Sequence, residues 1–138
     1  MKRVLLLIDL PIRSQEAIRK AISTFQDTKE FVLVSVLPDT YSHFWDYFEF
    51  EAKRDSREKN LEKLRGFLSA LEMPAGTKTD LEIIQGDPFE KLLELSIERK
   101  ADIIILQYPI GSSPRELTAR RLVRKLMLKS KVPVMIVN

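Results

Sequence analysis

The sequence predicts an α/β fold, a single open sheet of five parallel strands with helices on both faces. Short apolar runs alternate along the 138 residues with segments in which apolar residues recur at helical spacing, which is the pattern of βαβ units. The run at 103–106 is apolar without interruption, as expected of a parallel strand covered on both faces. A chain of this length fits one domain, residues 1–138.

The amino-terminal part of the chain predicts a strand, a helix and a second strand. The first strand spans 4–8 and ends at Asp9, and Ser14 is placed to cap the helix that follows. The second strand spans 31–37, and the connection between the two should be right-handed. The helix should lie on the sheet through an apolar stripe made of Ala17, Ile18, Ala21, Ile22 and Phe25.

Residues 41–50 contain six of the eleven aromatic residues of the chain. One interpretation is that these rings close the end of the core and begin the next helix. The other is a lid or an adhesive patch beside the second strand, because exposed aromatic residues mark contact surfaces. His43 lies among them without a Ser, a Cys or a paired acid at catalytic spacing, so it is predicted to be a surface or packing residue.

The middle of the chain predicts a long helix at 51–71, which ends at 73–76, and a third strand at 81–84. The next helix has a clear start, with Asp87 as N-cap, Pro88 as first residue and Glu90 at the capping-box position. Its predicted apolar stripe consists of Phe89, Leu92, Leu93 and Ile97.

The last part predicts a strand at 103–106, a helix at 114–129 and a final strand at 134–137. Gly111 is expected to take a positive φ in the turn before the helix, with Ser113 as N-cap. Ligands of open α/β sheets bind beyond the carboxyl ends of the strands, so residues 107–113 are the predicted binding turn. The inward residues of the helix are predicted to be Leu117, Leu122, Leu126 and Met127.

Composition excludes several classes of function. The chain has no cysteine and one histidine, which excludes disulfides, zinc-thiolate sites and thiol catalysis and argues against a histidine metal site. It has no apolar run long enough to span a membrane, and the apolar run 4–8 is too short for a signal peptide, so a cytoplasmic protein is expected. Two asparagines and four glutamines among many charged residues resemble heat-adapted proteins. Residues 115–131 include seven basic residues and one acidic residue. A nucleic-acid partner is possible there, but a solvated helix surface is the favoured interpretation.

Four segments, in order and at the right spacing, resemble the universal stress protein family over essentially the whole chain. Residues 4–17 are similar to the family opening, a strand that ends in Asp and, five residues on, a Ser before an Ala-Leu helix. Gly86-Asp87-Pro88 before a Leu-rich helix, residues 101–105 and residues 132–137 match the other recurring pieces.

The resemblance implies the strand order 3-2-1-4-5 of the adenine-nucleotide alpha-hydrolase-like folds, a homodimer and, in one branch, ATP between the ends of the first and fourth strands. The glycine motif of that branch falls on Gln107, Ile110, Arg120 and Arg121, none of which matches it. The resemblance therefore implies the branch that does not bind ATP, and no cofactor is expected.

Two positions of the family's nucleotide pocket are retained. Asp9 and the region of Val36 correspond to the adenine and ribose contacts. Ser113, Pro114 and Glu116 form an ordinary capping box, in which Glu116 supplies the negative charge that a phosphate would bring. The alternative is a phosphate site made of arginine guanidinium groups, which pair with phosphate bidentately.

The predicted function is that of a homodimeric stress-response protein of the cytoplasm, which acts through an unknown protein partner or by protection and is not an enzyme. The alternative is a nucleotide-binding module for ATP or AMP, with slow ATP hydrolysis at most. Its candidate residues are Asp9, Val36, Gly111, Ser113, Arg120 and Arg121. The expected dimer contact is the uncharged edge strand, which pairs antiparallel with a second copy through Val134, Met135, Ile136 and Val137.

Overall fold

A computed structural model of the chain describes residues 2–8, 15–37, 62, 65–85, 87–107 and 114–137. Five parallel strands form one sheet in the order β3-β2-β1-β4-β5. The predicted fold class and strand order are therefore confirmed. The strands are β1 (Arg3–Ile8), β2 (Glu30–Leu37), β3 (Lys78–Gln85), β4 (Ile103–Gln107) and β5 (Val134–Val137).

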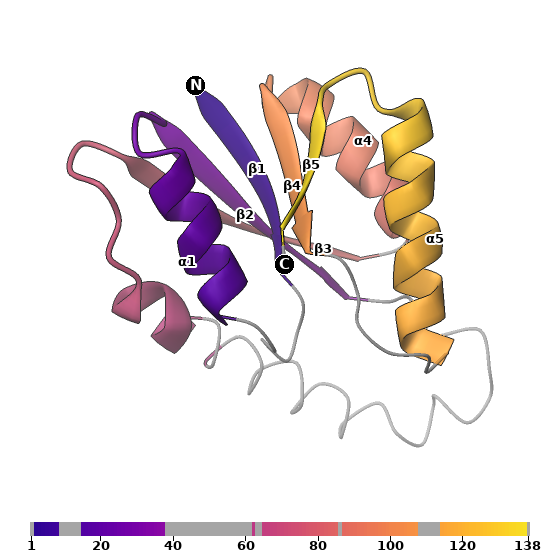
Figure 1. Ribbon diagram of the computed structural model, residues 1–138, viewed down its shortest axis with the longest axis horizontal. Coiled ribbons are helices and arrows are strands. Elements are labelled where there is room, and N and C mark those ends of the chain that lie inside the picture. Colours follow the sequence, from indigo (N-terminus) through magenta and orange to yellow (C-terminus); the bar gives the residue numbers. More distant parts are fainter. Residues whose placement is uncertain are drawn as a thin grey trace.

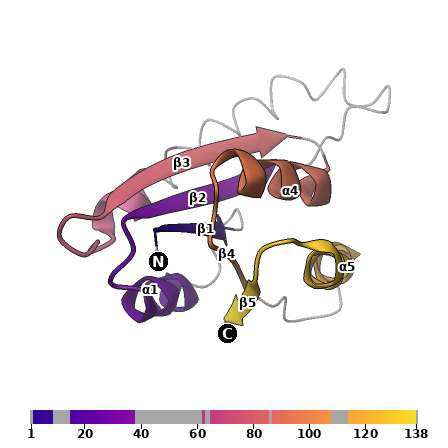
Figure 2. The ribbon, with the colours of Figure 1, turned by 90° about the horizontal axis from the view of Figure 1, so that it is seen from above.

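Three labelled helices flank the sheet on its two faces (Figure 1). They are α1 (Gln15–Thr24), α4 (Pro88–Glu98) and α5 (Pro114–Lys129). Seen from above, α1 lies on one side of the sheet, and α4 and α5 lie on the other (Figure 2). The layers are those of an open α/β sheet, which needs helices on both faces to bury its parallel strands.

The register of the strands places β1 at the centre, where Val4 is opposite Phe31 of β2 and Ile103 of β4. Because side chains alternate along a strand, each strand contributes to two separate cores. The core under α1 contains Val4, Leu6, Ile8, Ile18, Ala21, Ile22, Phe31, Leu33, Phe67, Leu71, Ile103, Ile105 and Val137. The core under α4 and α5 contains Leu5, Val32, Val34, Leu92, Leu95, Ala101, Ile104, Leu106, Val123 and Leu126.

The predicted start of α4 is confirmed. The Asp87 side chain accepts a hydrogen bond from the Phe89 N–H at 3.0 Å, and Pro88 is the first helical residue. An N-cap side chain satisfies one of the backbone donors that a helix leaves unpaired at its first turn.

Three residues predicted to face inward are exposed. Leu117 is 45% exposed, Met127 is 58% exposed and Ile97 of α4 is 65% exposed. The contact surface of each helix is narrower than the apolar spacing suggests, because successive residues are turned by about 100°. Met127 follows the fully buried Leu126 by one such step and faces away from the sheet.

The third strand is longer than predicted, since it starts at Lys78 and ends at Gln85. It lies at one edge of the sheet, and polar residues are tolerated there. Before it, residues 65–70 are helical and bury Phe67, and the chain turns at Gly76, whose φ of 80° favours glycine. Most of the helix predicted at 51–71 lies outside the described residues.

Candidate functional site

The strand order reverses between β1 and β4, and this switch point is where open α/β sheets place a ligand. The described part of it consists of the carboxyl ends of β1, β2 and β4 and the start of α5. Among the sequence-predicted site residues, Asp9, Gly111 and Ser113 lie outside the described residues. So do Ile110, His43 and the aromatic segment 41–50.

The described candidates are Val36, Arg120 and Arg121. Val36 lies in β2 opposite Ile84, one residue before the strand ends. Arg120 and Arg121 lie on α5, six and seven residues after its first residue, Pro114. At 1.5 Å per residue, Arg120 lies about 9 Å along the helix axis from its start.

This position decides what the backbone of α5 can offer an anion. Only the first four N–H groups of a helix are free, and a proline at the first position removes one of them. The N–H groups of Arg120 and Arg121 are deeper in α5, so they are committed to the helix. The Arg120 side chain is half-buried and already has an interaction partner, whereas Arg121 is exposed.

A buried hydroxyl lies close to the same switch point. Ser35 of β2 is opposite Ile8, the last residue of β1, and its side chain is fully buried. The Oγ atom of Ser35 has no hydrogen-bond partner among the described residues. Sequence reasoning passed over this residue, although its place inside the apolar run 31–37 indicates burial.

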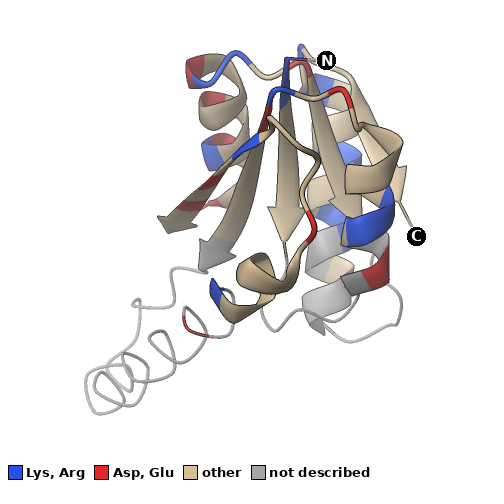
Figure 3. Ribbon diagram, turned by 90° about the vertical axis from the view of Figure 1, so that its left-hand side faces the viewer, with Lys and Arg blue, Asp and Glu red and all other residues tan. Residues whose placement is uncertain are grey.

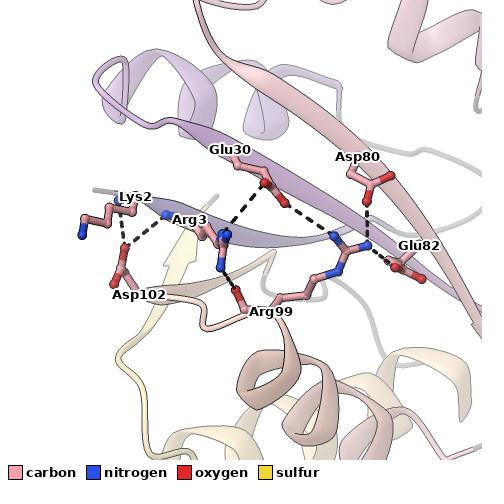
Figure 4. A network of polar contacts seen from close by, with 7 residues as sticks. All are labelled: Lys2, Arg3, Glu30, Asp80, Glu82, Arg99 and Asp102. Carbon is pink, nitrogen blue, oxygen red and sulfur yellow. Dashed lines mark hydrogen bonds and ion pairs between the residues drawn. The ribbon is translucent and has the colours of Figure 1, made fainter.

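A charged network lies at the opposite edge, where the strands begin (Figure 4). The Arg99 guanidinium group binds carboxylates from two strands: its Nη1 is 3.6 Å from Glu30 Oε1, and its Nη2 is 2.6 Å from Asp80 Oδ2. The same Nη2 also donates to Glu82. Hydrogen bonds to Glu82 and Asp80 raise the pKa of Arg99, and the hydrogen bond from Arg99 lowers the pKa of Asp80.

Asp102 joins β1 to the turn before β4. Its Oδ2 accepts hydrogen bonds from the backbone N–H groups of Lys2 at 2.8 Å and Arg3 at 3.1 Å. The hydrogen bonds from the Arg3 and Lys2 N–H groups favour the carboxylate and lower the pKa of Asp102. Arg3 in turn donates from Nη1 to the Arg99 carbonyl oxygen at 3.0 Å.

Basic residues gather at this same end of the sheet, as the blue segments of the ribbon show (Figure 3). A lysine lies at the start of each of the four strands β1 to β4, and sequence reasoning missed the set. The signal was present, since each apolar run follows a lysine within a few residues. These lysines are Lys2, Lys29, Lys78 and Lys100.

The comparisons with known proteins decide the family. The model of the universal stress protein family matches residues 1–138. The chain belongs to the universal stress protein family. Among curated proteins, none matches it.

Solved structures share the fold of this universal stress protein. A universal stress protein from Lactobacillus plantarum, UspA, superposes with a TM-score of 0.73 at 16% identity, over 99% of this chain and 97% of that one. One from Archaeoglobus fulgidus in complex with dAMP has a TM-score of 0.57 at 15% identity, over 100% and 98%. A family protein from Arabidopsis thaliana with AMP bound has a TM-score of 0.57 at 16% identity, over 99% and 90%. At these identities the likeness shows the fold.

Neither a metal-binding cluster nor a membrane-spanning helix is found in the described part of this universal stress protein. Its described residues hold no group of three or more His, Cys, Asp or Glu side chains that could bind a metal ion. Within the same residues, no helix is long and apolar enough to cross a membrane.

Proposed function

We propose that this universal stress protein is a homodimeric binding protein of the cytoplasm, which acts in the stress response through a protein partner or by protection and not as an enzyme. Membership of the family supports a role in the stress response. The observation that carries the proposal is the edge strand β5, which has a neighbour on one side only.

The two edges of the sheet differ in charge. At one edge, β3 carries Lys78, Asp80 and Glu82, and charged residues on an edge strand discourage pairing with another chain. At the other, β5 reads Val-Met-Ile-Val without a charge. A second copy is therefore expected at β5, where antiparallel pairing about a two-fold axis gives a closed dimer.

The backbone of β5 offers donors for this pairing. The Ile104 N–H donates to the Pro133 carbonyl oxygen at 2.9 Å, and Ile105 is opposite Met135. Because bonding groups alternate along a parallel strand, the N–H groups of Val134 and Ile136 face away from β4. Both are free to bond with a partner strand.

Sedimentation velocity tests the proposal. Wild-type protein at tens of micromolar should sediment as a dimer, and Met135→Lys should shift it toward the monomer by placing a charge in the interface. Thr79→Lys, on the edge strand β3, is the matched control and should remain dimeric. A monomeric wild type, or a dimer indifferent to Met135→Lys, would refute the β5 interface. A thermal melt of each variant separates loss of pairing from loss of the fold.

The absence of ATP binding is part of the same proposal. Its support is the geometry of α5, in which the N–H groups at positions 120 and 121 are bonded within the helix. A phosphate cradle made of backbone groups therefore has no donors at these positions. At these two positions only the arginine side chains could hold a phosphate.

Nucleotide binding through arginine side chains is the second candidate function. It is favoured by the solved structures of the same fold that are in complex with dAMP or have AMP bound. Calorimetric titration with ATP and Mg²⁺ separates the two candidates. The leading proposal predicts no saturable heat at micromolar ATP, whereas micromolar binding that is lost in Arg120→Ala or Arg121→Ala would establish the second candidate.

A further inference from the structure

The amino-terminal edge of the sheet carries a row of lysines. The Lys78 N–H donates to the Lys29 carbonyl oxygen at 2.8 Å, and the Glu30 N–H donates to the Lys2 carbonyl oxygen at 2.9 Å. Lys78, Lys29 and Lys2 therefore lie at the starts of three adjacent strands, with Lys78 opposite Glu30 and one residue out of register with Lys29. Lys100, which precedes β4, continues the row on the other side of β1. Adjacent strands are about 4.8 Å apart, so the row extends over about 14 Å.

These residues surround a cavity of about 610 Å³. Five basic and two acidic residues line it, which gives it a formal charge of +3. They are Lys2, Arg3, Lys29, Glu30, Lys78, Lys100 and Asp102. An open cavity with this excess of positive charge attracts anions.

The acids at this edge are bound by other groups. Glu30 lies 3.9 Å from the Arg3 Nε and 3.6 Å from the Arg99 Nη1, and Asp102 accepts from two backbone N–H groups. Among the described residues, no ion pair engages the ammonium groups of the four lysines. All four side chains are exposed, and Figure 4 marks no contact of the Lys2 ammonium group. Lys78 and Lys2 act on Asp80 and Asp102 through space without a close ion pair, so their exposed ammonium groups can still meet a ligand.

Lys100 holds its place in this row with a strained backbone. Its φ is 52°, a left-handed conformation in which glycine is favoured, and its N–H bonds to the Ile97 carbonyl oxygen at the end of α4. The left-handed conformation costs a residue with a side chain about 1 kcal/mol. A lysine there complements the carboxyl end of the helix, and it also brings a fourth positive charge to the cavity.

We propose that this cavity binds a linear oligophosphate, either as a free chain or as the phosphate tail of a small molecule. A single phosphate would contact one or two lysines, whereas a chain of phosphates is long enough to reach the lysines that several strands contribute to the cavity lining. Lysine binds phosphate as a point charge on a flexible stem, so it suits a chain of variable position. The site lies at the end of the strands opposite to the switch point, and is independent of the proposed dimer and of any nucleotide bound there.

Calorimetry at low salt tests this site with inorganic triphosphate as the probe. Triphosphate should bind about tenfold more tightly than orthophosphate, and its affinity should fall as salt is added. The triple variant Lys29→Gln, Lys78→Gln, Lys100→Gln should weaken triphosphate binding by about tenfold or more. The matched control Lys20→Gln, Lys91→Gln, Arg124→Gln removes the same number of charges from exposed positions on three helices and should bind like the wild type.

The proposal would be wrong if the triple variant bound triphosphate as tightly as the wild type. It would also be wrong if the triple variant and its control lost the same affinity for triphosphate. Binding of an RNA oligomer without binding of triphosphate would likewise contradict it. Arg121→Ala should leave triphosphate binding unchanged, and a loss there would assign the anion to α5. Titration with ATP distinguishes a free oligophosphate from the phosphate tail of a small molecule. A site for the free chain should bind triphosphate more tightly than ATP, whereas a site for a phosphate tail should bind the two equally well. Amide shifts of Lys2, Lys29 and Lys78 in wild-type protein provide the same test if the triple variant fails to fold.

Discussion

Lys100, at the end of the sheet where the strands begin, has a strained backbone conformation and also carries a positive charge. Glycine adopts its φ of 52° without strain. Lys100→Gly should therefore raise the free energy of unfolding by about 1 kcal/mol, less the greater entropy of the unfolded chain. Urea denaturation measures the change.

The same substitution inside α4 serves as the control for Lys100, which lies just after that helix. Lys91 lies in the first half of the helix, and Lys91→Gly should lower the free energy of unfolding by up to about 1 kcal/mol. Opposite signs at the two positions are the expected outcome. A loss of stability in both variants would show that the Lys100 side chain contributes more than its backbone conformation costs.

Asp102 makes stability depend on pH at the same edge of the sheet. Its folded pKa lies below the ordinary 3.8, because the Arg3 and Lys2 N–H groups favour the carboxylate. Its contribution is therefore complete above pH 3.8 and is lost as the pH falls through 3.8 toward the folded pKa.

The pH dependence of Asp102→Asn tests this. At neutral pH the variant should be less stable than the wild type by about 1 kcal/mol, and the difference should close as the pH falls below 3.8. Denaturant melts between pH 7 and pH 3, with Asp27→Asn in the exposed turn after α1 as control, provide the measurement. A difference that persists unchanged to the lowest pH would show that the carboxylate charge is not the cause.

At the scale of an element, the start of α4 depends on one side chain. Asp87→Ala removes the acceptor of the Phe89 N–H and should lower the free energy of unfolding by about 1 kcal/mol. Asp87→Asn retains an acceptor oxygen and should stay within a few tenths of a kcal/mol of the wild type. Thermal melts that rank alanine equal to asparagine would mean that the cap does not stabilise the helix.

The strands and the helix starts could be predicted from the sequence because they depend on local pattern. Apolar runs locate β1, β2, β4 and β5 to within a residue or two, and a capping sequence fixes Pro88 as the first residue of α4. The exposure of Leu117, Met127 and Ile97 could not be predicted, since it depends on how each helix is rotated on the sheet. The polar extension of β3 was missed for a related reason, because edge strands tolerate charged side chains that central strands do not.

At the scale of the whole molecule, the candidate sites depend on contacts between distant segments. The glycine motif could be tested on the sequence alone, and its positions at Arg120 and Arg121 lie inside α5. The lysine row could not be recognised in this way, since Lys2, Lys29 and Lys78 become neighbours only when parallel strands align their starts. The sequence shows a lysine shortly before each apolar run, but the parallel pairing of the strands is what brings these lysines to one end of the sheet.

The proposed homodimer rests on the difference in charge between the edge strands β3 and β5. Its formation should change the hydrogen exchange of the β5 amides. In a dimer through β5, the N–H groups of Val134 and Ile136 bond to the partner strand. In a monomer they face solvent. Their rate of hydrogen exchange therefore reports on the interface itself, independently of molecular shape.

Hydrogen–deuterium exchange of β5, measured at protein concentrations from about 1 to 100 μM at fixed pH, is the most direct test. The account predicts that the Val134 and Ile136 amides become protected as the concentration rises, while that of Leu106 in β4 is protected throughout. Met135→Lys should remove the protection of the first two and leave that of Leu106 unchanged. Fast exchange of Val134 and Ile136 at every concentration in the wild-type protein would contradict the proposed homodimer.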